Sequence, residues 1–301
     1  MGKIRFDDQV VVITGAGSGI GRAYAHAFAS RGARVVVNDL GGNRDGTGEA
    51  RGAADTVVAE LAQYGGGAVA NYDSVATVSG GERIIATAED HFGRVDVLVN
   101  NAGVLRDKSL LKMTEEDWEL VVNVHLKGAF CVTRPAFALM KKNGYGRIIN
   151  TTSGSGLYGN FGQAAYMAAK MGVVGLMHSV VAEGSKHNIL CNAISPVAAS
   201  RMTDDVMPAE ILEKLKPEFI TPLVLFLASQ VNRETGMIFN CAAGWFSRTA
   251  ICCAPGLCIG DAKREITPEE IHDNWMAITS LDDAVPLDSV VDSFRFMTSL
   301  F

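Results

Sequence analysis

The chain has 301 residues and a formal net charge of −6. This acidic balance argues against a nucleic-acid partner, because nucleic-acid-binding proteins present basic surfaces. Hydrophobic residues make up 48% and charged residues 20% of the sequence, which argues against disorder and predicts one large folded core.

The ends of the chain carry no signal that predicts export or membrane insertion. The first eight residues, MGKIRFDD, lack the apolar core of a signal peptide. No uninterrupted apolar run reaches the roughly 20 residues of a membrane-spanning helix. The final Ser299-Leu300-Phe301 differs from the Ser-Lys-Leu type of peroxisomal address.

The cysteines follow neither the spacing of a disulfide framework nor that of paired zinc ligands. We therefore expect reduced thiols and no metal site, and a metal or redox role of the Cys252-Cys253-Cys258 group is the less favoured alternative. The six cysteines are Cys131, Cys191, Cys241, Cys252, Cys253 and Cys258.

Short apolar runs alternate with helix-favouring stretches along most of the chain. This alternation predicts an α/β fold with a doubly wound, mostly parallel sheet and helices on both faces. Strands are expected at Val10–Thr14, Arg34–Asp39, Ala68–Tyr72, Val95–Asn100, Arg147–Thr152, Leu190–Ile194 and Met237–Cys241. Helices are expected at Arg22–Arg31, Ala53–Tyr64, Ser79–Phe92 and Glu115–Lys141.

A glycine-rich turn joins the first strand to the first helix. Its glycines are spaced G-x-x-x-G-x-G and let the backbone approach a pyrophosphate, while the helix N-terminus offers unpaired N–H groups. The turn could instead serve packing alone. The residues expected to bind a dinucleotide here are Gly15, Ser18, Gly19, Ile20 and Gly21.

Asp39 ends the second predicted strand. A carboxylate there can accept hydrogen bonds from the ribose hydroxyls of an adenosine and would repel a 2′-phosphate. Leu40 follows it, so no cation stands next in sequence, and NAD is predicted over NADP. Two alternatives stay open, a plain strand-ending turn and the binding of a 2′-phosphate by Arg22 or Arg44.

The third and fourth predicted strands end in polar or small residues. Asp73 could hydrogen-bond the adenine amine and Val75 could pack on the adenine ring, and Ser74 between them is also expected to contact the cofactor. In the run Asn101-Ala102-Gly103, small side chains allow a flat cofactor to lie against the backbone. Both runs also fit ordinary turn chemistry.

Tyr166 and Lys170 are four residues apart and so share one face of a helix. A nearby ammonium and a positively charged nicotinamide would lower the phenol pKa from its usual value of about 10. The phenol could then exchange a proton with an alcohol or ketone near neutral pH. Ser153, just after a predicted strand, could hold the same substrate oxygen.

Asn123 lies in the middle of a predicted helix, where asparagine is unfavourable. It could kink that helix and hold a water molecule that links Lys170 to solvent. An ordinary surface asparagine is the alternative.

Taken together, these motifs resemble the short-chain dehydrogenase/reductase family over the first two thirds of the chain. The resemblance implies a seven-stranded Rossmann-type sheet, a nicotinamide cofactor and a catalytic tetrad. In that tetrad Ser153 orients the substrate oxygen, Tyr166 is the acid/base and Lys170 also holds the nicotinamide ribose; its members are Asn123, Ser153, Tyr166 and Lys170. Pro196 and Val197, where the family usually has Pro-Gly, should border the nicotinamide with Ala199.

Several less common strings are similar to the (3R)-hydroxyacyl-CoA dehydrogenase units of the peroxisomal multifunctional (D-bifunctional) enzymes of β-oxidation. They are residues 36–42, 157–163, 198–203, 242–245 and the tail from residue 266. This likeness implies oxidation of (3R)-3-hydroxyacyl-CoA to 3-ketoacyl-CoA with NAD, a homodimer and a peroxisomal location; without it the expected location is cytoplasmic. It also implies an NAD-binding domain at residues 1–245, and we expect the extension at 246–301 to pack on that domain or on a partner subunit.

The substrate side is less readable. A CoA ester is a large anion that needs cations, for which Arg106, Lys108 and Arg201 are candidates. Ser153 and Tyr166 should meet the reacting end, and an acyl groove could use Leu105, Tyr158, Phe161 and Met202.

Other activities remain possible from the sequence. The same tetrad serves 3-ketoacyl thioester reductases and hydroxysteroid dehydrogenases, and a nucleotide-sensing regulator could keep the fold without the chemistry. In the tail, Thr267-Pro268-Glu269-Glu270 is a capping box that predicts a helix to about Ile278.

Overall fold

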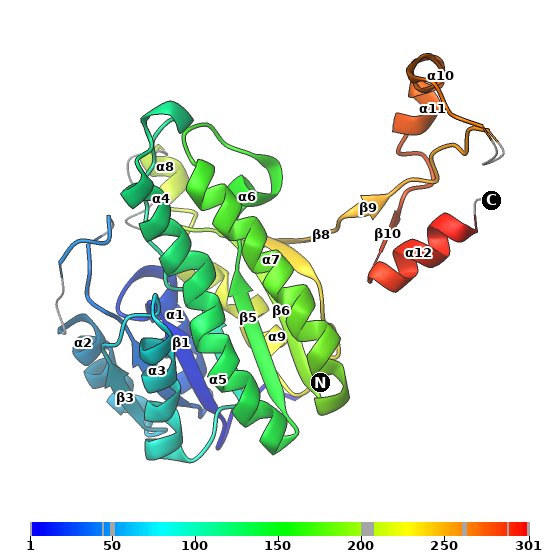
Figure 1. Cartoon of the computed structure of the whole chain (residues 1–301). Coiled ribbons are helices and arrows are strands. Elements are labelled where there is room, and N and C mark those ends of the chain that lie inside the picture. The colour runs from blue at the N-terminus through cyan, green and yellow to red at the C-terminus, as the bar shows by residue number, and fades with distance from the viewer. Residues whose placement is uncertain are drawn as a thin grey trace. The chain divides into compact units, whose positions relative to one another are not determined.

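An eight-stranded sheet of order β3-β2-β1-β4-β5-β6-β7-β8 is the centre of the first of two units, Met1–Arg248 and Thr249–Phe301 (Figure 1). The computed structural model describes residues 2–43, 45–48, 52–199, 208–260, 264–287 and 289–299. The strands are β1 (Val10–Thr14), β2 (Arg34–Asn38), β3 (Ala68–Asn71), β4 (Val97–Asn100), β5 (Gly146–Thr151), β6 (Ile189–Val197), β7 (Ile238–Ala242) and β8 (Trp245–Thr249). Strands β1 to β7 pair in parallel, as predicted.

The eighth strand was not expected from the sequence. Ala243 and Gly244 form a two-residue turn after β7 and have positive φ angles of 47° and 83°. A turn this short reverses the chain, so β8 returns beside β7 as an antiparallel edge. The predicted boundary at residues 245 and 246 therefore falls inside a hairpin.

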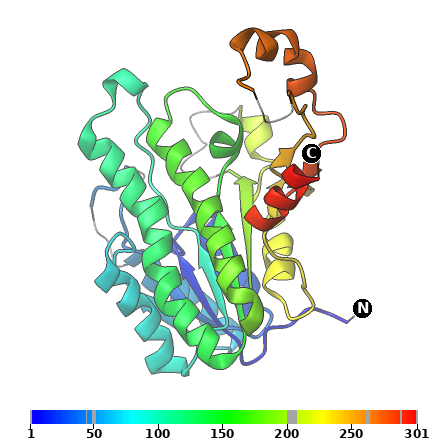
Figure 2. The same cartoon turned by 45° about the vertical axis from the view of Figure 1, so that its right-hand side comes forward.

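Helices cover both faces of the sheet (Figure 1, Figure 2). Alternate residues of β1 point to opposite faces, with Val11 and Ile13 in one buried cluster and Val10 and Val12 in the other. The first cluster includes residues of α1 (Gly19–Ala29), α2 (Gly52–Leu61) and α9 (Thr221–Ala228). The second includes residues of α3 (Val78–Phe92), α5 (Gly128–Asn143) and α7 (Ala164–Gly184). Short helices are α6 (Gly154–Tyr158) and α8 (Ala209–Leu212), with 3₁₀ turns at Ala62–Tyr64, Leu110–Lys112, Ser185–His187 and Pro217–Phe219.

The predicted helix over residues 115–141 is interrupted where Asn123 lies. Helix α4 (Glu115–Val122) begins at a capping box of Thr114 and Asp117, and a π-helical segment, Asn123–Lys127, separates it from α5. π-Helical insertions are rare and concentrate at functional sites. The irregularity expected at Asn123 is thus present as a widened turn.

Helix α7 with its following 3₁₀ turn, Ala164–His187, is long and apolar enough to cross a membrane by length and composition. The core helix of a globular domain passes the same test. Here the helix packs against β5, β6, α4 and α5, and it buries the side chain of Lys170.

The described residues of the second unit form a small antiparallel pair and three helices. In it β9 (Cys252–Cys253) pairs with β10 (Val285–Pro286), and the helices are α10 (Pro268–Asp273), α11 (Trp275–Thr279) and α12 (Val290–Thr298). The capping box at Thr267 is confirmed, but α10 ends at Asp273 because the backbone leaves helical geometry at Asn274. Where this extension packs stays a prediction.

Helices α3 and α5 approach closely at a glycine. A Cβ on Gly81 would lie 2.2 Å from the carbonyl oxygen of Cys131, whereas a Cβ on Gly175, on the exposed face of α7, meets nothing within 4 Å. Gly81→Ala should lower the free energy of unfolding by about 1–3 kcal/mol through overpacking. Gly175→Ala should raise it by up to about 1 kcal/mol through helix propensity. Urea denaturation measures both, and equal stability of the two variants would contradict the packing argument.

Candidate active site

The carboxyl ends of the parallel strands open into a cleft of about 510 Å³, the position expected for ligands in such sheets. Most of the sequence-predicted site residues line this cleft, although they come from well-separated parts of the chain. They are Gly15, Ser18, Gly19, Ile20, Gly21, Asp39, Asp73, Ser74, Val75, Asn101, Ala102, Gly103, Ser153, Tyr166, Lys170, Pro196 and Val197.

The glycine-rich turn packs closely against the segment after β4. Because it carries no side chains at its glycines, the side of the turn that faces the cleft is left open for a ligand. Gly15 has a φ of +64°, and a Cβ there would lie 2.8 Å from the Cα of Ala102. The Asn101 amide donates to the carbonyls of Thr14 and Gly15 at 3.0 and 3.1 Å and so fixes the turn. The N-terminus of α1 therefore borders the cleft with backbone N–H groups that no side chain covers, an arrangement that can bind a pyrophosphate.

Asp39, which directly follows β2, lines the cleft beside the glycine-rich turn. Its carboxylate accepts hydrogen bonds from the backbone N–H groups of Gly17 at 2.8 Å and Gly41 at 2.7 Å. Each oxygen keeps a second lone pair, so the fixed carboxylate can still accept from a hydroxyl. Of the two cations considered for a 2′-phosphate, Arg22 pairs with Glu60 at 2.8 Å and Arg44 lies outside the described residues.

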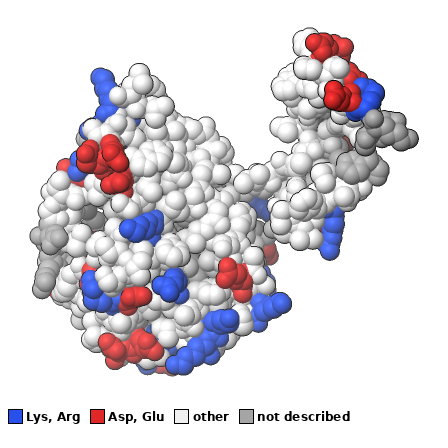
Figure 3. Space-filling view, in the orientation of Figure 1, with Lys and Arg blue, Asp and Glu red and all other residues white. Residues whose placement is uncertain are grey.

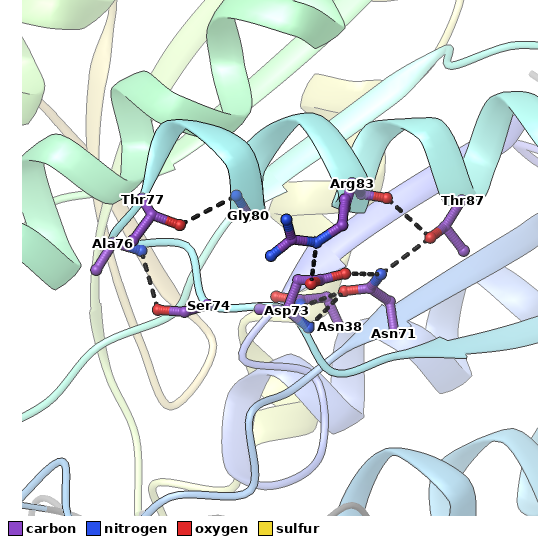
Figure 4. Close-up of polar contacts among 9 residues, drawn as sticks. All are labelled: Asn38, Asn71, Asp73, Ser74, Ala76, Thr77, Gly80, Arg83 and Thr87. Carbon is purple, nitrogen blue, oxygen red and sulfur yellow. Dashed lines mark hydrogen bonds and ion pairs between the residues drawn. The ribbon is translucent and has the colours of Figure 1, made fainter.

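Asp73 is held in a polar network at the ends of β2 and β3 (Figure 4). Arg83 donates to one carboxylate oxygen and the Asn71 amide donates to the other at 2.9 Å. The Asn38 amide bridges the Asp73 carbonyl at 2.9 Å and the Asn71 side chain at 2.8 Å. The network orients Asp73 rigidly at the cleft, and its contact with adenine stays a prediction.

Helix α7 places Tyr166 and Lys170 on one face, as predicted, with Lys170 Nζ 5.5 Å from the centroid of the Tyr166 ring. Two hydrogen bonds connect Lys170 to the end of β5. Its ammonium donates to the Thr151 carbonyl at 2.7 Å, and the Thr152 hydroxyl donates to the Lys170 carbonyl at 2.8 Å.

Ser153 caps the N-terminus of the short helix α6, where its hydroxyl accepts from the Ser155 N–H at 3.2 Å. The same side chain hydrogen-bonds the phenol of Tyr166. A hydroxyl, a phenol and an amine thus meet at one wall of the cleft, a combination suited to moving a proton to or from a substrate oxygen.

The electrostatics of this group differ from the sequence-based expectation. Burial lowers the pKa of Lys170 to about 7. Burial also raises the pKa of the half-buried Tyr166 phenol, while the Ser153 hydrogen bond opposes that rise. The expectation of a lowered phenol pKa is therefore wrong for the protein alone, because desolvation outweighs the favourable contacts.

His125 is a cleft residue to which the sequence reasoning assigned no role. Its ring meets the Tyr166 ring edge-on, with centroids 5.0 Å apart and an interplanar angle of 87°. Its Nε2 lies 2.8 Å from the Val104 carbonyl oxygen, and burial holds the pKa of the imidazole well below its usual value. His125 lies two residues after Asn123. The π-helical segment turns its side chain toward Tyr166, and this orientation could not be predicted from the spacing of residues in the sequence.

Four predicted site residues are not among those that line the cleft, namely Asn123, Tyr158, Phe161 and Ala199. Phe161 is 90% exposed, and Tyr158, which is 65% exposed, accepts a hydrogen bond from the Asn240 amide at 3.2 Å. The backbone N–H of Ala199 donates to the Leu215 carbonyl. Ligand contacts of these four residues stay predictions.

Two of the basic side chains proposed to bind CoA already form ion pairs within the protein. Lys108 and Arg106 pair with the buried carboxylate of Asp117 at 2.6 and 3.5 Å. Arg201 and Met202 lie outside the described residues, whereas Leu105 lines the cleft as expected. On the face shown in Figure 3, basic side chains are interspersed with acidic ones, so no single basic patch dominates it.

Comparisons with known proteins agree with this geometry. A family model described as short chain dehydrogenase matches residues 9–210. The peroxisomal multifunctional enzyme type 2 of Mus musculus is 50% identical over 290 residues, which is 96% of this chain and 39% of that protein. The solved full-length peroxisomal multifunctional enzyme type 2 from Drosophila melanogaster superposes with a TM-score of 0.84 at 40% identity, over 99% of this chain and 50% of that one.

A third similar structure is a 7α-hydroxysteroid dehydrogenase complexed with NADH and 7-oxo glycochenodeoxycholic acid. It has a TM-score of 0.71 and 30% identity, and the match covers 80% of this chain and 95% of that one. The chain spans half or less of the length of the two multifunctional relatives.

The buried amine of Lys170 should make stability depend on pH. Its folded-state pKa of about 7 lies below the usual 10.5, so between these values the unfolded chain binds more protons and stability rises with pH. Lys170→Met should therefore raise the thermal unfolding midpoint most at pH 7 and below, with the gain shrinking toward pH 10. Lys127→Met, at an exposed position of the π-helical segment, is the matched control. A gain independent of pH would contradict the burial argument.

Proposed function

Because the chain belongs to the short-chain dehydrogenase family, whose model matches residues 9–210, we propose that it oxidises (3R)-3-hydroxyacyl-CoA to 3-ketoacyl-CoA with NAD. The observation that carries the dehydrogenase assignment is the contact between Ser153 and Tyr166, one helical turn from Lys170, in the same cleft as the glycine-rich turn. The choice of substrate is supported by likeness to the multifunctional enzymes over nearly the whole chain.

In the proposed reaction Ser153 donates a hydrogen bond to the substrate oxygen and Tyr166 removes its proton. A charged Lys170 would favour the tyrosinate, which offsets the burial that raises the phenol pKa. The nicotinamide, when bound, supplies the acceptor for the hydride that leaves C3. The protein's contribution is to align the hydroxyl and to shift the proton affinities of these side chains.

The cleft residues fit a nicotinamide dinucleotide. The bare backbone at Gly15, Gly19 and Gly21 would hold the pyrophosphate, and the Asp39 carboxylate would accept from the adenosine ribose. NAD is favoured over NADP because Asp39 is anionic and Arg22 is paired with Glu60. The solved hydroxysteroid dehydrogenase with NADH supports a cofactor of this class.

We also propose a homodimer. The second unit exposes large apolar side chains, including Met276, Leu281, Val290 and Phe294, which is more than a solvated extension needs. A peroxisomal location is proposed on the names of the multifunctional relatives alone.

The function is tested by following NADH formation with (3R)- and (3S)-3-hydroxyacyl-CoA of several chain lengths, with NADP in parallel. We expect turnover of the 3R form with NAD only. Tyr166→Phe should reduce kcat by at least roughly 10²–10⁴-fold while NADH binding by fluorescence is retained, because only the proton-transfer group is lost.

Tyr64→Phe, on the 3₁₀ turn after α2, is the control and should behave as wild type. Turnover of a hydroxysteroid, or reduction of 3-ketoacyl thioesters with NADPH alone, would favour another activity of the family. Wild-type rates from Tyr166→Phe would overturn the assigned chemistry.

Cofactor choice should depend on the charge of Asp39. Asp39→Asn keeps the shape and one acceptor oxygen but removes the negative charge, so the ratio of kcat/KM for NAD to that for NADP should fall by about tenfold or more. Asp90→Asn, at an exposed position of α3, should leave the ratio unchanged. An unchanged ratio in Asp39→Asn would show that discrimination lies elsewhere.

A further inference from the structure

The loop between β2 and α2 extends to the β4 side of the cleft. We call residues 45–48 of this loop the strap. In the sheet, β2 and β4 are the two neighbours of β1, and the glycine-rich turn follows the end of β1. The loop runs beside α4 (Figure 1), and the strap contacts both α4 and the segment after β4. A chain segment that connects the end of β2 with the β4 side in this way passes over the start of the glycine-rich turn.

Arg106 joins the strap to the β4 side. Its Nε donates a hydrogen bond to the Asp45 carbonyl at 2.7 Å, and one of its terminal nitrogens pairs with the buried carboxylate of Asp117 at 3.5 Å. Asp117 is fixed, because it belongs to the capping box that begins α4. The planar guanidinium can reach both acceptors at once, which a single ammonium group does less well. Arg106 is thus a latch, that is, a bridge between the strap and the fixed start of α4.

The strap packs on α4 at a glycine. Gly46 has a φ of +81°, and a Cβ there would lie 3.1 Å from a methyl carbon of Leu120 and 3.3 Å from one of Val104. Leu120 and Val104 belong to the small apolar cluster that also packs against Tyr166. A side chain at residue 46 would therefore push the strap away from this cluster.

The strap has its own hydrogen bonds and is joined only loosely to the loop after β4. The Asp45 carboxylate accepts from the backbone N–H and the hydroxyl of Thr47 at 3.0 and 2.7 Å, and the Gly46 N–H donates to the Asn43 carbonyl at 3.0 Å. Between the strap and the loop after β4 is an open hollow of about 460 Å³, lined by Asn43, Asp45, Leu105 and Asp107. The strap can therefore move away from that loop without disturbing a packed core.

The loop that carries the strap is also part of the wall of the cleft. Gly42, Asn43 and Gly46 line the cleft together with Asp39 and the glycine-rich turn. A dinucleotide bound at that turn and at Asp39 would therefore lie against this loop.

We propose that the strap closes over a dinucleotide bound at the glycine-rich turn, and that Arg106 is the positioning residue that latches the strap. This inference rests on the cofactor assignment of the proposed function. It gives Arg106 a partner within the protein in place of the CoA expected from the sequence. Because the cofactor passes the strap on entry and on exit, the strength of the latch controls the rates of both steps.

The latch has a distinctive kinetic consequence. The bond between Arg106 and Asp45 is present without a ligand, so breaking it should change the rates of NADH binding more than the affinity. A released strap is open for a larger fraction of the time, and both association and dissociation become faster. Loss of a direct contact with the cofactor would instead change mainly the dissociation rate. Loss of a cation that binds only CoA would change neither rate.

The latch is tested by stopped-flow fluorescence of NADH binding. Arg106→Met should raise the association and dissociation rate constants by about 3- to 30-fold each, as expected for the loss of a partly exposed hydrogen bond from a charged group. Arg106→Lys cannot reproduce both contacts and should behave similarly. Lys108→Met removes the other cation that pairs with Asp117 but leaves Arg106 in place, and it should bind NADH at wild-type rates.

Two glycine variants test the packing of the strap and serve if the Arg106 variants fail to fold. Gly46 and Gly48 have similar φ angles of +81° and +75°, so alanine strains the backbone in both. A Cβ on Gly48 would lie 3.4 Å from the Asn43 amide, an ordinary contact, whereas one on Gly46 meets Leu120. Gly46→Ala should therefore raise both NADH rate constants above those of Gly48→Ala.

Wild-type NADH rates in both Arg106→Met and Gly46→Ala would overturn the proposal. A faster dissociation alone would also overturn it, because it would make Arg106 a direct cofactor contact. These outcomes do not depend on the substrate. A protein that bound no NADH would contradict the cofactor assignment itself, whereas NADH binding without turnover of hydroxyacyl-CoA would contradict only the proposed substrate.

Discussion

The site depends on one constraint, the burial of the Lys170 amine between α7 and the end of β5. Its ammonium donates a hydrogen bond to the Thr151 carbonyl and its carbonyl accepts one from the Thr152 hydroxyl, so the helix is anchored to the end of the strand. Burial disfavours the charge, so the stability of the fold falls as the pH drops from about 10 to about 7 and stays lowered below that. The protein thus buries a destabilising amine next to the proposed proton-transfer group, as proteins do at sites where stability is exchanged for function.

The parallel sheet converts distant sequence motifs into one cleft. Asp39, Asn101 and Ser153 follow β2, β4 and β5, and the register of those strands brings their ends to one edge. The glycine turn packs on Ala102 so closely that a Cβ could not be added at Gly15. The fold and the cleft are therefore specified by the same residues, which explains why the sequence signals for the fold and for the proposed cofactor site coincide.

The sequence was informative where function depends on local spacing. Tyr166 and Lys170 share a face because they are four apart in a helix, and the seven parallel strands followed from their apolar runs. It failed where tertiary context decides. A π-helical segment reorients His125, Asp117 engages Arg106 and Lys108, and burial reverses the expected pKa change of Tyr166. None of these effects has a signature in residue spacing.

The residues proposed to contact the substrate lie in less regular structure than the residues proposed to move the proton. The loop after β4 is joined to the segment before α7 through the Lys108 N–H, which donates to the Gly162 carbonyl at 2.8 Å, and through Gln163, which donates to Asp107 at 2.8 Å. Asp107 also raises the pKa of Tyr166, so a change in this loop pair can affect the proposed acid/base residue. Because loops often carry specificity, a change in this loop pair is expected to alter substrate choice and the proton affinity of Tyr166 together.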